Sequence, residues 1–263
     1  MKLGVRLASG DPISAEDDQA LEELVACHLR ALELARPRLD SLARAAGTPP
    51  LHITARAKTT GTIIEKLRRE DRMSLARMGD LAGFRIVGAF DLDGQDRLYE
   101  EIARRFPPDP RPAKPIDRRL NPSHGYRALH AAVSFDGVSI EIQIRTVAQH
   151  IWADLMERIA DRLGRQIRYG DPPTPPKGGS NRDAAKFRRD AARIIKLMMD
   201  LSEDLASEQF VGLESAATAS EQLDGVGSAY MDEITERAWK TLRQGLRKIG
   251  IDFSVNLTPW RTS

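Results

Sequence analysis

The stretch Arg127-Ala-Leu-His-Ala-Ala-Val-Ser-Phe-Asp-Gly-Val-Ser-Ile-Glu-Ile-Gln-Ile-Arg145 predicts a β-hairpin around which the rest of the chain can be arranged. Its Asp136-Gly137 pair is a strong signal for a two-residue turn, so we expect strands over 127–135 and 138–145. In the second strand, isoleucines alternate with Glu141 and Gln143. One face of that strand is therefore apolar, and the other carries polar side chains.

Helix and strand patterns alternate on both sides of this hairpin. A proline-rich stretch at 107–115 requires a loop, and Gly and Pro at 170–180 predict a linker. The remaining pattern predicts an α+β fold with a mixed, largely antiparallel sheet flanked by helices. The expected strands cover 51–55 and 84–90, and the expected helices cover 14–46 (with Pro37 as an interruption or a restart), 60–69, 91–106, 149–163, a segment from 181 onward, and 231–249.

Breaks in the pattern suggest how the chain is divided. We expect an N-terminal helical segment over 1–50, a core over 51–170 and a linker over 171–180. C-terminal helices over 181–250 follow, with Asn181 as the expected N-cap, and then a tail over 251–263. Two amphipathic helices cannot bury both of their apolar stripes alone, so we expect them to pack on the core or on another subunit.

Composition is that of an ordinary soluble globular protein. The 263 residues are 41% hydrophobic and 30% charged, with a net charge of +2, so no overall field draws the chain to nucleic acid or membrane. The single cysteine, Cys27, excludes an intrachain disulfide and lies among apolar positions that favour the core. Residues 1–11 lack the apolar region of a secretory signal, and no apolar run approaches the roughly 20 residues that span a bilayer. We therefore expect a cytoplasmic protein without a membrane partner.

Basic residues gather where a strand is expected to meet a helix. Arg56 and Lys58 are two residues apart and point to one side of the chain, and Thr62 and Lys66 share a face of the helix. A helix N-terminus favours anions, so this junction suits a phosphate group. A solvated helix face explains the same residues about as well.

Two carboxylates are candidates for a magnesium site. Asp80 precedes an apolar strand, where a turn or cap aspartate is the commoner role, and Glu141 lies on a face that could simply meet solvent. If the two converge, they form the kind of oxygen site that holds Mg2+ together with substrate phosphates. Tyr126 follows Gly125, and an isolated tyrosine there is more often a core or edge aromatic. Beside Arg118, Arg119 and His130 it could stack on a purine.

Four motifs in this order resemble those of the RelA/SpoT synthetase domain. They are Arg56-x-Lys58-x-x-x-Thr62-x-x-x-Lys66, Asp80-Leu-Ala-Gly-Phe-Arg85, Gly125-Tyr-Arg-Ala-Leu-His130 and Glu141-Ile-Gln-Ile-Arg-Thr146. The resemblance covers about residues 51–163. It implies a nucleotidyltransferase-like fold and a stand-alone, small alarmone synthetase. Such an enzyme transfers pyrophosphate from ATP to the 3′-hydroxyl of GTP or GDP and releases AMP.

The resemblance also implies a role for each matching residue. Arg56 and Arg85 would stack on the adenine of ATP, while Lys58, Thr62 and Lys66 would bind its phosphates. Asp80 and Glu141 would hold Mg2+, and Glu141 would also activate the acceptor hydroxyl. Tyr126 would stack on the acceptor guanine, and the other acceptor-side residues would be Arg118, Arg119, His130, Gln143 and His150.

Departures from the family pattern leave the acceptor open. Asn121-Pro-Ser-His-Gly125 lacks the lysine that often precedes the Gly-Tyr pair. After Trp152-Ala, family members often have a glutamate and a histidine; here the glutamate is displaced by one position and the histidine is absent. One alternative is a toxin-like relative that modifies an adenine nucleotide or the tRNA 3′ end; another is a nucleotide-binding module without catalysis. The C-terminal helices would suit a homo-oligomer. A tRNA acceptor would need a basic surface, for which the candidates, otherwise a solvated helix face, are Arg182, Lys186, Arg188, Arg189 and Arg193.

Overall fold

Two compact units make up the chain in the computed structural model, which describes residues 3–45, 52–70, 73–107, 116–175, 178–207 and 226–248. The first unit comprises Met1–Ile86, Asp96–Ile116 and Leu129–Ile144, and the second comprises Val87–Gln95, Asp117–Ala128 and Arg145–Ser263. Each unit is therefore assembled from separate stretches of sequence. The expected loop at 107–115 lies outside the described residues except for Pro107.

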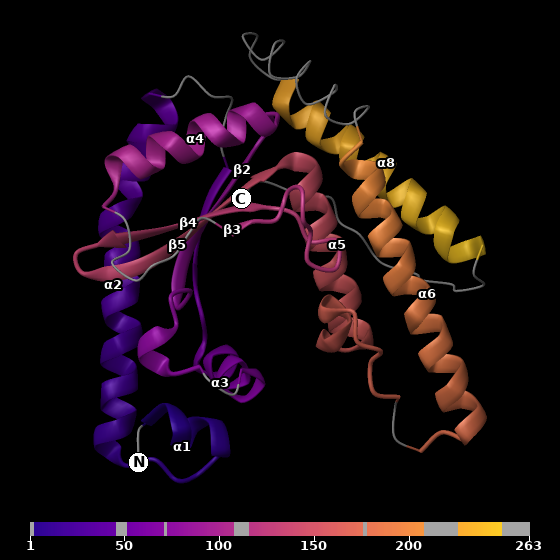
Figure 1. Cartoon of the computed structure of the whole chain (residues 1–263), viewed down its shortest axis with the longest axis horizontal. Helices are drawn as coiled ribbons and strands as arrows, with labels where there is room; N and C mark the ends of the chain where they lie inside the picture. The colour runs from indigo at the N-terminus through magenta and orange to yellow at the C-terminus, as the bar shows by residue number, and fades with distance from the viewer. Residues whose placement is uncertain are drawn as a thin grey trace. The chain divides into compact units, whose positions relative to one another are not determined.

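A five-stranded sheet contains the predicted hairpin (Figure 1). Its strands are β1 (His52–Ala57), β2 (Ala82–Gly88), β3 (Ile116–Asp117), β4 (Leu129–Phe135) and β5 (Val138–Thr146), in the order β1-β2-β5-β4-β3. β4 and β5 pair antiparallel from Leu129↔Ile144 to Phe135↔Val138. Between them, Asp136 and Gly137 have φ angles of 50° and 75°, as the Asp-Gly turn requires. The sheet with its flanking helices confirms the predicted α+β class.

The N-terminal helices pack together in the first unit. α1 (Leu3–Ser9) contacts α3 (Thr60–Arg69), and an apolar cluster joins both to α2 (Ala15–Ala45) through Leu7, Leu21 and Ile63. Ser14 and Asp17 exchange side-chain to backbone hydrogen bonds of 3.2 Å each, which confirms the predicted start of α2. Most of α4 (Leu92–Arg105) also belongs to this unit.

Two expectations for α2 were wrong. Pro37 neither interrupts nor restarts the helix, which is continuous. Proline removes one backbone hydrogen bond, but the neighbouring Ala35 and Leu39 are fully buried, so packing offsets this loss. Cys27 is exposed rather than in the core. The apolar stripe around it is wider than the buried face, as Leu29, itself 45% exposed, illustrates.

Three helices form the core of the second unit. α5 (Val147–Leu163) contacts both α6 (Asn181–Leu205) and α8 (Val226–Lys248), and α6 and α8 lie side by side (Figure 1). Trp152, Met198 and Trp239 meet in their shared apolar cluster. The C-terminal helices therefore pack on α5, which belongs to the expected core. Of the expected final helix, the side chains of Ile234 and Leu246 lie outside the described part.

Serine and threonine side chains fix where these helices begin. Thr146 caps α5 in a reciprocal arrangement with Gln149, and Ser180 caps α6 in the same way with Asp183. The prediction of Asn181 as the N-cap of α6 was wrong by one residue, because the N-cap is Ser180. The Ser180 hydroxyl accepts a hydrogen bond from the backbone N–H of Asp183, and the Asp183 carboxylate accepts one from the backbone N–H of Ser180. Among the described residues, the helices include none that is both long and apolar enough to cross a bilayer.

Candidate active site

A cluster of two lysines and one aspartate lies in the first unit. Lys58 follows β1, and its backbone N–H donates to the carbonyl of Leu81 at 2.8 Å, which fixes the end of β1 beside the start of β2. Asp80 Oδ2 lies 2.8 Å from Nζ of Lys66, on α3, and 3.3 Å from Nζ of Lys58. All three side chains stay partly exposed. Two positive charges are thus held in place around one carboxylate.

The N-terminus of α3 adjoins this cluster in sequence. Thr59 is its N-cap and accepts from the N–H of Thr62, while the Thr62 hydroxyl donates to the carbonyl of Thr59 at 2.9 Å. Lys66 lies one turn further on the same helix face as Thr62. Arg56 is exposed on β1 and Arg85 is half-buried on β2, so all the residues predicted for the donor nucleotide belong to this unit.

Glu141 forms a second cluster in the first unit, on paired strands. In the register of β4 and β5, His130 is opposite Gln143, two pairs away from Ala132 opposite Glu141. Nδ1 of His130 lies 2.9 Å from Oε1 of Glu141, and Nε2 of Gln143 donates to Oε2 at 2.9 Å. An ionised carboxylate can only accept, so the histidine is the donor. Both oxygens of Glu141 therefore have a partner.

The pKa of Glu141 reflects these partners. Burial by itself raises the pKa, but the hydrogen bond and charge of His130, the hydrogen bond from Gln143 and the charge of Lys58 outweigh it and lower the pKa from 4.5 to about 2. Glu141 is therefore a full negative charge at neutral pH. Lys58 acts on Glu141 and also pairs with Asp80, so it links the two clusters.

A divalent cation is compatible with these carboxylates. Oδ1 of Asp80 is buried and has no hydrogen-bond partner within the described part of the chain, which leaves an acceptor that a cation could satisfy. That part also contains no group of three or more acidic, histidine or cysteine side chains suited to a metal. Mg2+ commonly uses one or two carboxylates plus substrate phosphates, so the donor set fits it.

A glycine lets the strand that carries Glu141 approach β2. A Cβ at Gly83 would lie 2.4 Å from the backbone oxygen of Glu141, a distance that real side chains do not tolerate. Any larger residue would push β5 away from β2 and take Glu141 with it. Sequence reasoning treated Gly83 as part of a motif and did not identify this packing role.

The second unit contains Tyr126 on a loop of residues 117–128, here called the Tyr126 loop. At its tip, Ser123 and Tyr126 form two backbone hydrogen bonds, of 3.2 and 3.0 Å. Between them, His124 and Gly125 have φ angles of 52° and 86°. Two successive left-handed residues define a tight hairpin turn, and Tyr126 leaves it in a fixed direction.

Arg145 holds the Tyr126 side chain and was missed as a site residue. Its guanidinium carbon lies 5.0 Å from the centre of the tyrosine ring, and its Nη2 donates to the tyrosine hydroxyl at 2.9 Å. Arg145 is only 4% exposed. The signal that could have found it is a charged residue next to the fully buried Ile144, because a buried arginine needs a dedicated partner.

The other residues predicted for the acceptor differ in their surroundings. Arg119 makes a two-pronged ion pair with Asp117, with a shortest distance of 2.6 Å, and donates to the carbonyl of Leu92 at 3.1 Å. These bonds keep the Tyr126 loop folded and also lower the pKa of Asp117. Arg118 is exposed, and His150 is buried in α5. These residues share the second unit with Tyr126, whereas His130 and Gln143 belong to the first unit.

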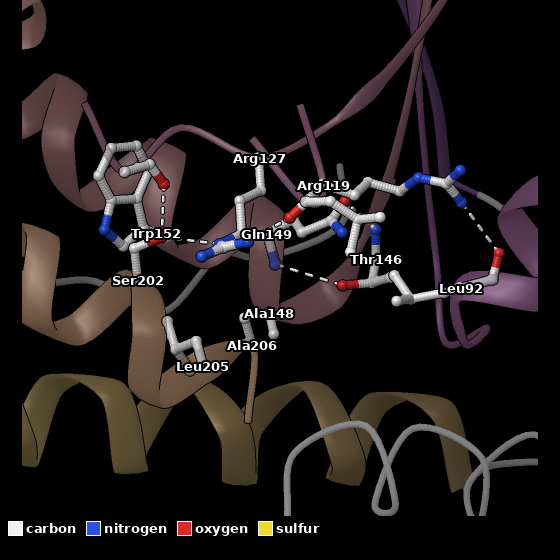
Figure 2. A pocket seen from close by; sticks show the side chains of 12 residues that line it. Leu92, Arg119, Arg127, Thr146, Ala148, Gln149, Trp152, Ser202, Leu205 and Ala206 are labelled. Atoms are coloured by element: carbon white, nitrogen blue, oxygen red, sulfur yellow. Dashed lines mark hydrogen bonds between the residues drawn. The ribbon is translucent and has the colours of Figure 1, made fainter. Parts of the chain in front are cut away.

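A pocket in the second unit is lined by residues of the Tyr126 loop, α5 and α6. Figure 2 shows Arg127 directed from the loop toward Ser202, with Trp152, Leu205 and Ala206 on the other walls. Gln149 lines it as well and is bonded to Gln95 at 2.9 Å. The pocket is largely apolar, and the polar groups at its edge bond to one another.

The basic residues of α6 lie on a face of mixed charge. Asp190 pairs with Lys186 at 2.7 Å and with Arg193 at 3.8 Å, and Asp183 lies beside Arg182 and Lys186. Acidic side chains thus offset the basic ones locally. This arrangement is typical of a solvated helix face.

Comparisons with known proteins agree with the motifs. Residues 55–160 match the sequence model of the region found in RelA / SpoT proteins. Uncharacterized protein Rv1366 of Mycobacterium tuberculosis is 34% identical over 209 residues, which cover 79% of this chain and 72% of that protein. GTP pyrophosphokinase YwaC of Bacillus subtilis is 29% identical over 134 residues, or 45% of this chain and 62% of that protein. The crystal structure of small alarmone synthetase 2 from Bacillus subtilis has the same fold, with a TM-score of 0.54 and 22% identity over 74% of this chain and 98% of that one.

Proposed function

The chain belongs to the RelA/SpoT family, and on this premise we propose that it is a (p)ppGpp synthetase. It transfers pyrophosphate from ATP to the 3′-hydroxyl of GTP or GDP. In this reaction the 3′-oxygen forms a bond with the β-phosphorus of ATP, and the bond from that phosphorus to the oxygen of the α-phosphate breaks. AMP leaves with that oxygen, and the acceptor hydroxyl releases its proton to solvent.

The observation that carries this proposal is the link between the two charged clusters. Lys58 and Lys66 surround Asp80, and Lys58 also acts on Glu141. Phosphoryl transfer needs positioning and charge stabilisation more than covalent help. Preassembled lysines next to two carboxylates, on strands and one helix, supply both needs.

On the donor side, Arg56 and Arg85 stack on the adenine, and Lys58, Thr62 and Lys66 bind the phosphates. Asp80 and Glu141 hold Mg2+, which when bound supplies positive charge to the phosphoryl oxygens. ATP phosphates compete with Asp80 for the two lysines, so ATP binding exchanges one anionic partner for another. The unpartnered Oδ1 of Asp80 supports its role as a metal ligand.

Glu141 acts mainly through its charge. A carboxylate with a pKa of about 2 takes up a proton poorly at neutral pH, so it is a weak general base. Its full charge instead suits it to bind the cation and to accept a hydrogen bond from the 3′-hydroxyl. His130 and Gln143 orient Glu141 by their hydrogen bonds and line the acceptor side from there.

On the acceptor side, Tyr126 stacks on the guanine, with its ring backed by Arg145. Arg118, Arg119 and His150 complete the acceptor side. Arg119 also folds the Tyr126 loop through Asp117, so its removal would alter both the loop and the charge near the nucleotide.

The test is incubation of the purified protein with γ-labelled ATP and Mg2+, run separately with GDP, GTP, no further acceptor, and bulk tRNA. We expect the label on a guanine nucleotide, together with an equal amount of AMP. Label on an adenine nucleotide or on tRNA would replace the proposal with a toxin-like activity. ATP binding without any transfer would favour a nucleotide-binding module.

A further inference from the structure

We infer that α6, which lies beyond the residues matched by the family, positions the Tyr126 loop, and that Ser202 is its central positioning residue. The inference rests on the proposed function only in that Tyr126 contacts the acceptor. The contacts themselves belong to one compact unit. They connect the loop to a helix that follows it by more than 50 residues in the sequence.

Ser202 bonds to both neighbours of Tyr126. Its side chain is buried, at 2% exposure, and its hydroxyl donates to the carbonyl of Gly125 at 2.6 Å. The same oxygen accepts from Nε of Arg127 at 3.1 Å (Figure 2). One hydroxyl thus satisfies a carbonyl before the tyrosine and a guanidinium after it. Serine is an uncommon residue among buried positions of an amphipathic helix, so these two bonds account for its presence.

Arg127 extends the attachment to the rest of the loop. Its Nη2 donates to Glu203 on α6 at 2.7 Å, and its Nη1 donates to the backbone carbonyl of Arg119. The guanidinium therefore ties α6 to both arms of the Tyr126 loop. Arg127 is mostly covered, with 12% of its side chain exposed, whereas Glu203 is 70% exposed.

The underside of the loop is fixed by packing. A Cβ at Gly125 would lie 2.7 Å from Cζ2 of Trp152 and 3.2 Å from Cβ of Ser202. Trp152 is itself held against α6, because its Nε1 donates to the carbonyl of Met198 at 2.6 Å. The turn that directs Tyr126 therefore packs against side chains of α5 and α6. Displacement of α6 would move these side chains and the turn together.

Loss of the Ser202 hydroxyl leaves a buried carbonyl and one guanidinium N–H without a partner. A buried polar group without a hydrogen-bond partner destabilises the folded loop, so the loop should open more often. The effect should reach acceptor binding through Tyr126 and leave ATP binding unchanged, because the residues proposed for ATP belong to the first unit. A merely structural serine would lower stability and affect both substrates alike.

The experiment compares wild type, Ser202→Ala, Ser202→Thr and the matched control Ser207→Ala, which deletes the same hydroxyl from an exposed position. Hydrogen–deuterium exchange over residues 117–128 and steady-state kinetics are measured on each full-length protein. For Ser202→Ala we expect faster exchange in this segment and a roughly tenfold higher acceptor KM with an unchanged ATP KM. Ser202→Thr restores the hydroxyl and should return both values toward wild type. Ser207→Ala should match wild type.

A second pair of variants tests the inference even if Ser202→Ala does not fold. Glu203→Gln weakens the bond to Arg127 at an exposed position, and Asp204→Asn removes the same charge from the next residue, which is also exposed. Glu203→Gln should show a smaller change of the same kind, and Asp204→Asn none.

Unchanged exchange over 117–128 in both Ser202→Ala and Glu203→Gln would overturn the inference, as would equal increases in the two KM values. If wild type transfers pyrophosphate to no acceptor, the proposed function fails. The exchange measurement, which needs no substrate, still decides whether α6 holds the loop.

Discussion

The charged clusters of the first unit and the Tyr126 loop of the second unit are stabilised by different means. Lys58, Asp80 and Glu141 lie on or beside strands, and their partners come from adjacent strands or from α3. Tyr126 lies on a loop whose partners include Ser202 and Trp152, far along the chain. Rigid strands can place charges accurately by register alone, whereas a loop needs contacts from other elements.

This difference predicts two kinds of failure. Changes in the clusters should abolish chemistry, because few other groups supply the same charges. Changes around the loop should weaken binding of one substrate in graded steps, because several separate contacts hold it.

Replacement of Glu141 should give the largest loss. In Glu141→Gln the negative charge disappears while the shape is kept, so the cation site and the hydrogen bond from His130 are both weakened. We expect the transfer rate to fall by more than about 100-fold, with ATP affinity, measured by titration calorimetry, largely retained. Glu100→Gln makes the same change at an exposed position on α4 and should behave as wild type. Normal turnover in Glu141→Gln would contradict the assigned role.

Removal of the Tyr126 ring should have an intermediate and selective effect. Stacking on a base contributes roughly 1–3 kcal/mol, so Tyr126→Ala should raise the acceptor KM roughly 5- to 150-fold and leave the ATP KM unchanged. Tyr126→Phe keeps the ring and loses the bond from Arg145, so it should lie close to wild type. An equal rise in the ATP KM would show that Tyr126 does not discriminate between the two nucleotides.

Substitution of one glycine in each unit compares the charged clusters with the Tyr126 loop directly. Gly83→Ala places a methyl group against the backbone of Glu141, and Gly125→Ala places one against Trp152. Each should lower the unfolding free energy by roughly 1–3 kcal/mol, measured by denaturant titration. In conditions where both variants are folded, Gly83→Ala should lower kcat, whereas Gly125→Ala should raise the acceptor KM. A higher acceptor KM in Gly83→Ala together with a lower kcat in Gly125→Ala would contradict the roles given to the two regions.

The smallest effect concerns pH. The pKa of Glu141 falls on folding, so its ionised form stabilises the native state above its ordinary pKa of 4.5, and this contribution is lost as pH falls toward 2. The difference in unfolding free energy between wild type and Glu141→Gln should therefore be constant from neutral pH to about 5 and shrink below 4.5. Thermal melts of both proteins across this range provide the measurement. A difference that stays constant as pH falls from 4.5 to about 3 would show that folding does not lower the pKa of Glu141.

Much of the fold could be predicted because its signals are local. The Asp136-Gly137 turn and the alternation around Glu141 predicted both strands of the hairpin to within two residues, and the helix over 60–69 was predicted with its observed bounds. Pro37 and Cys27 were misjudged because local rules ignore which part of a long helix is covered. At α6, serine and asparagine are both good caps, and only the backbone geometry chooses Ser180.

Periodicity, turn residues and ordered motifs specify most of the elements, the family and the types of residue that could bind a nucleotide. Which of those residues touch one another depends on the folded protein. The tertiary structure paired Asp80 with two lysines and gave Glu141 a pKa of about 2. It also set Arg145 against Tyr126 and Ser202 beneath the loop. Such contacts depend on register, burial and the meeting of distant segments, and none of these can be read from spacing along the chain.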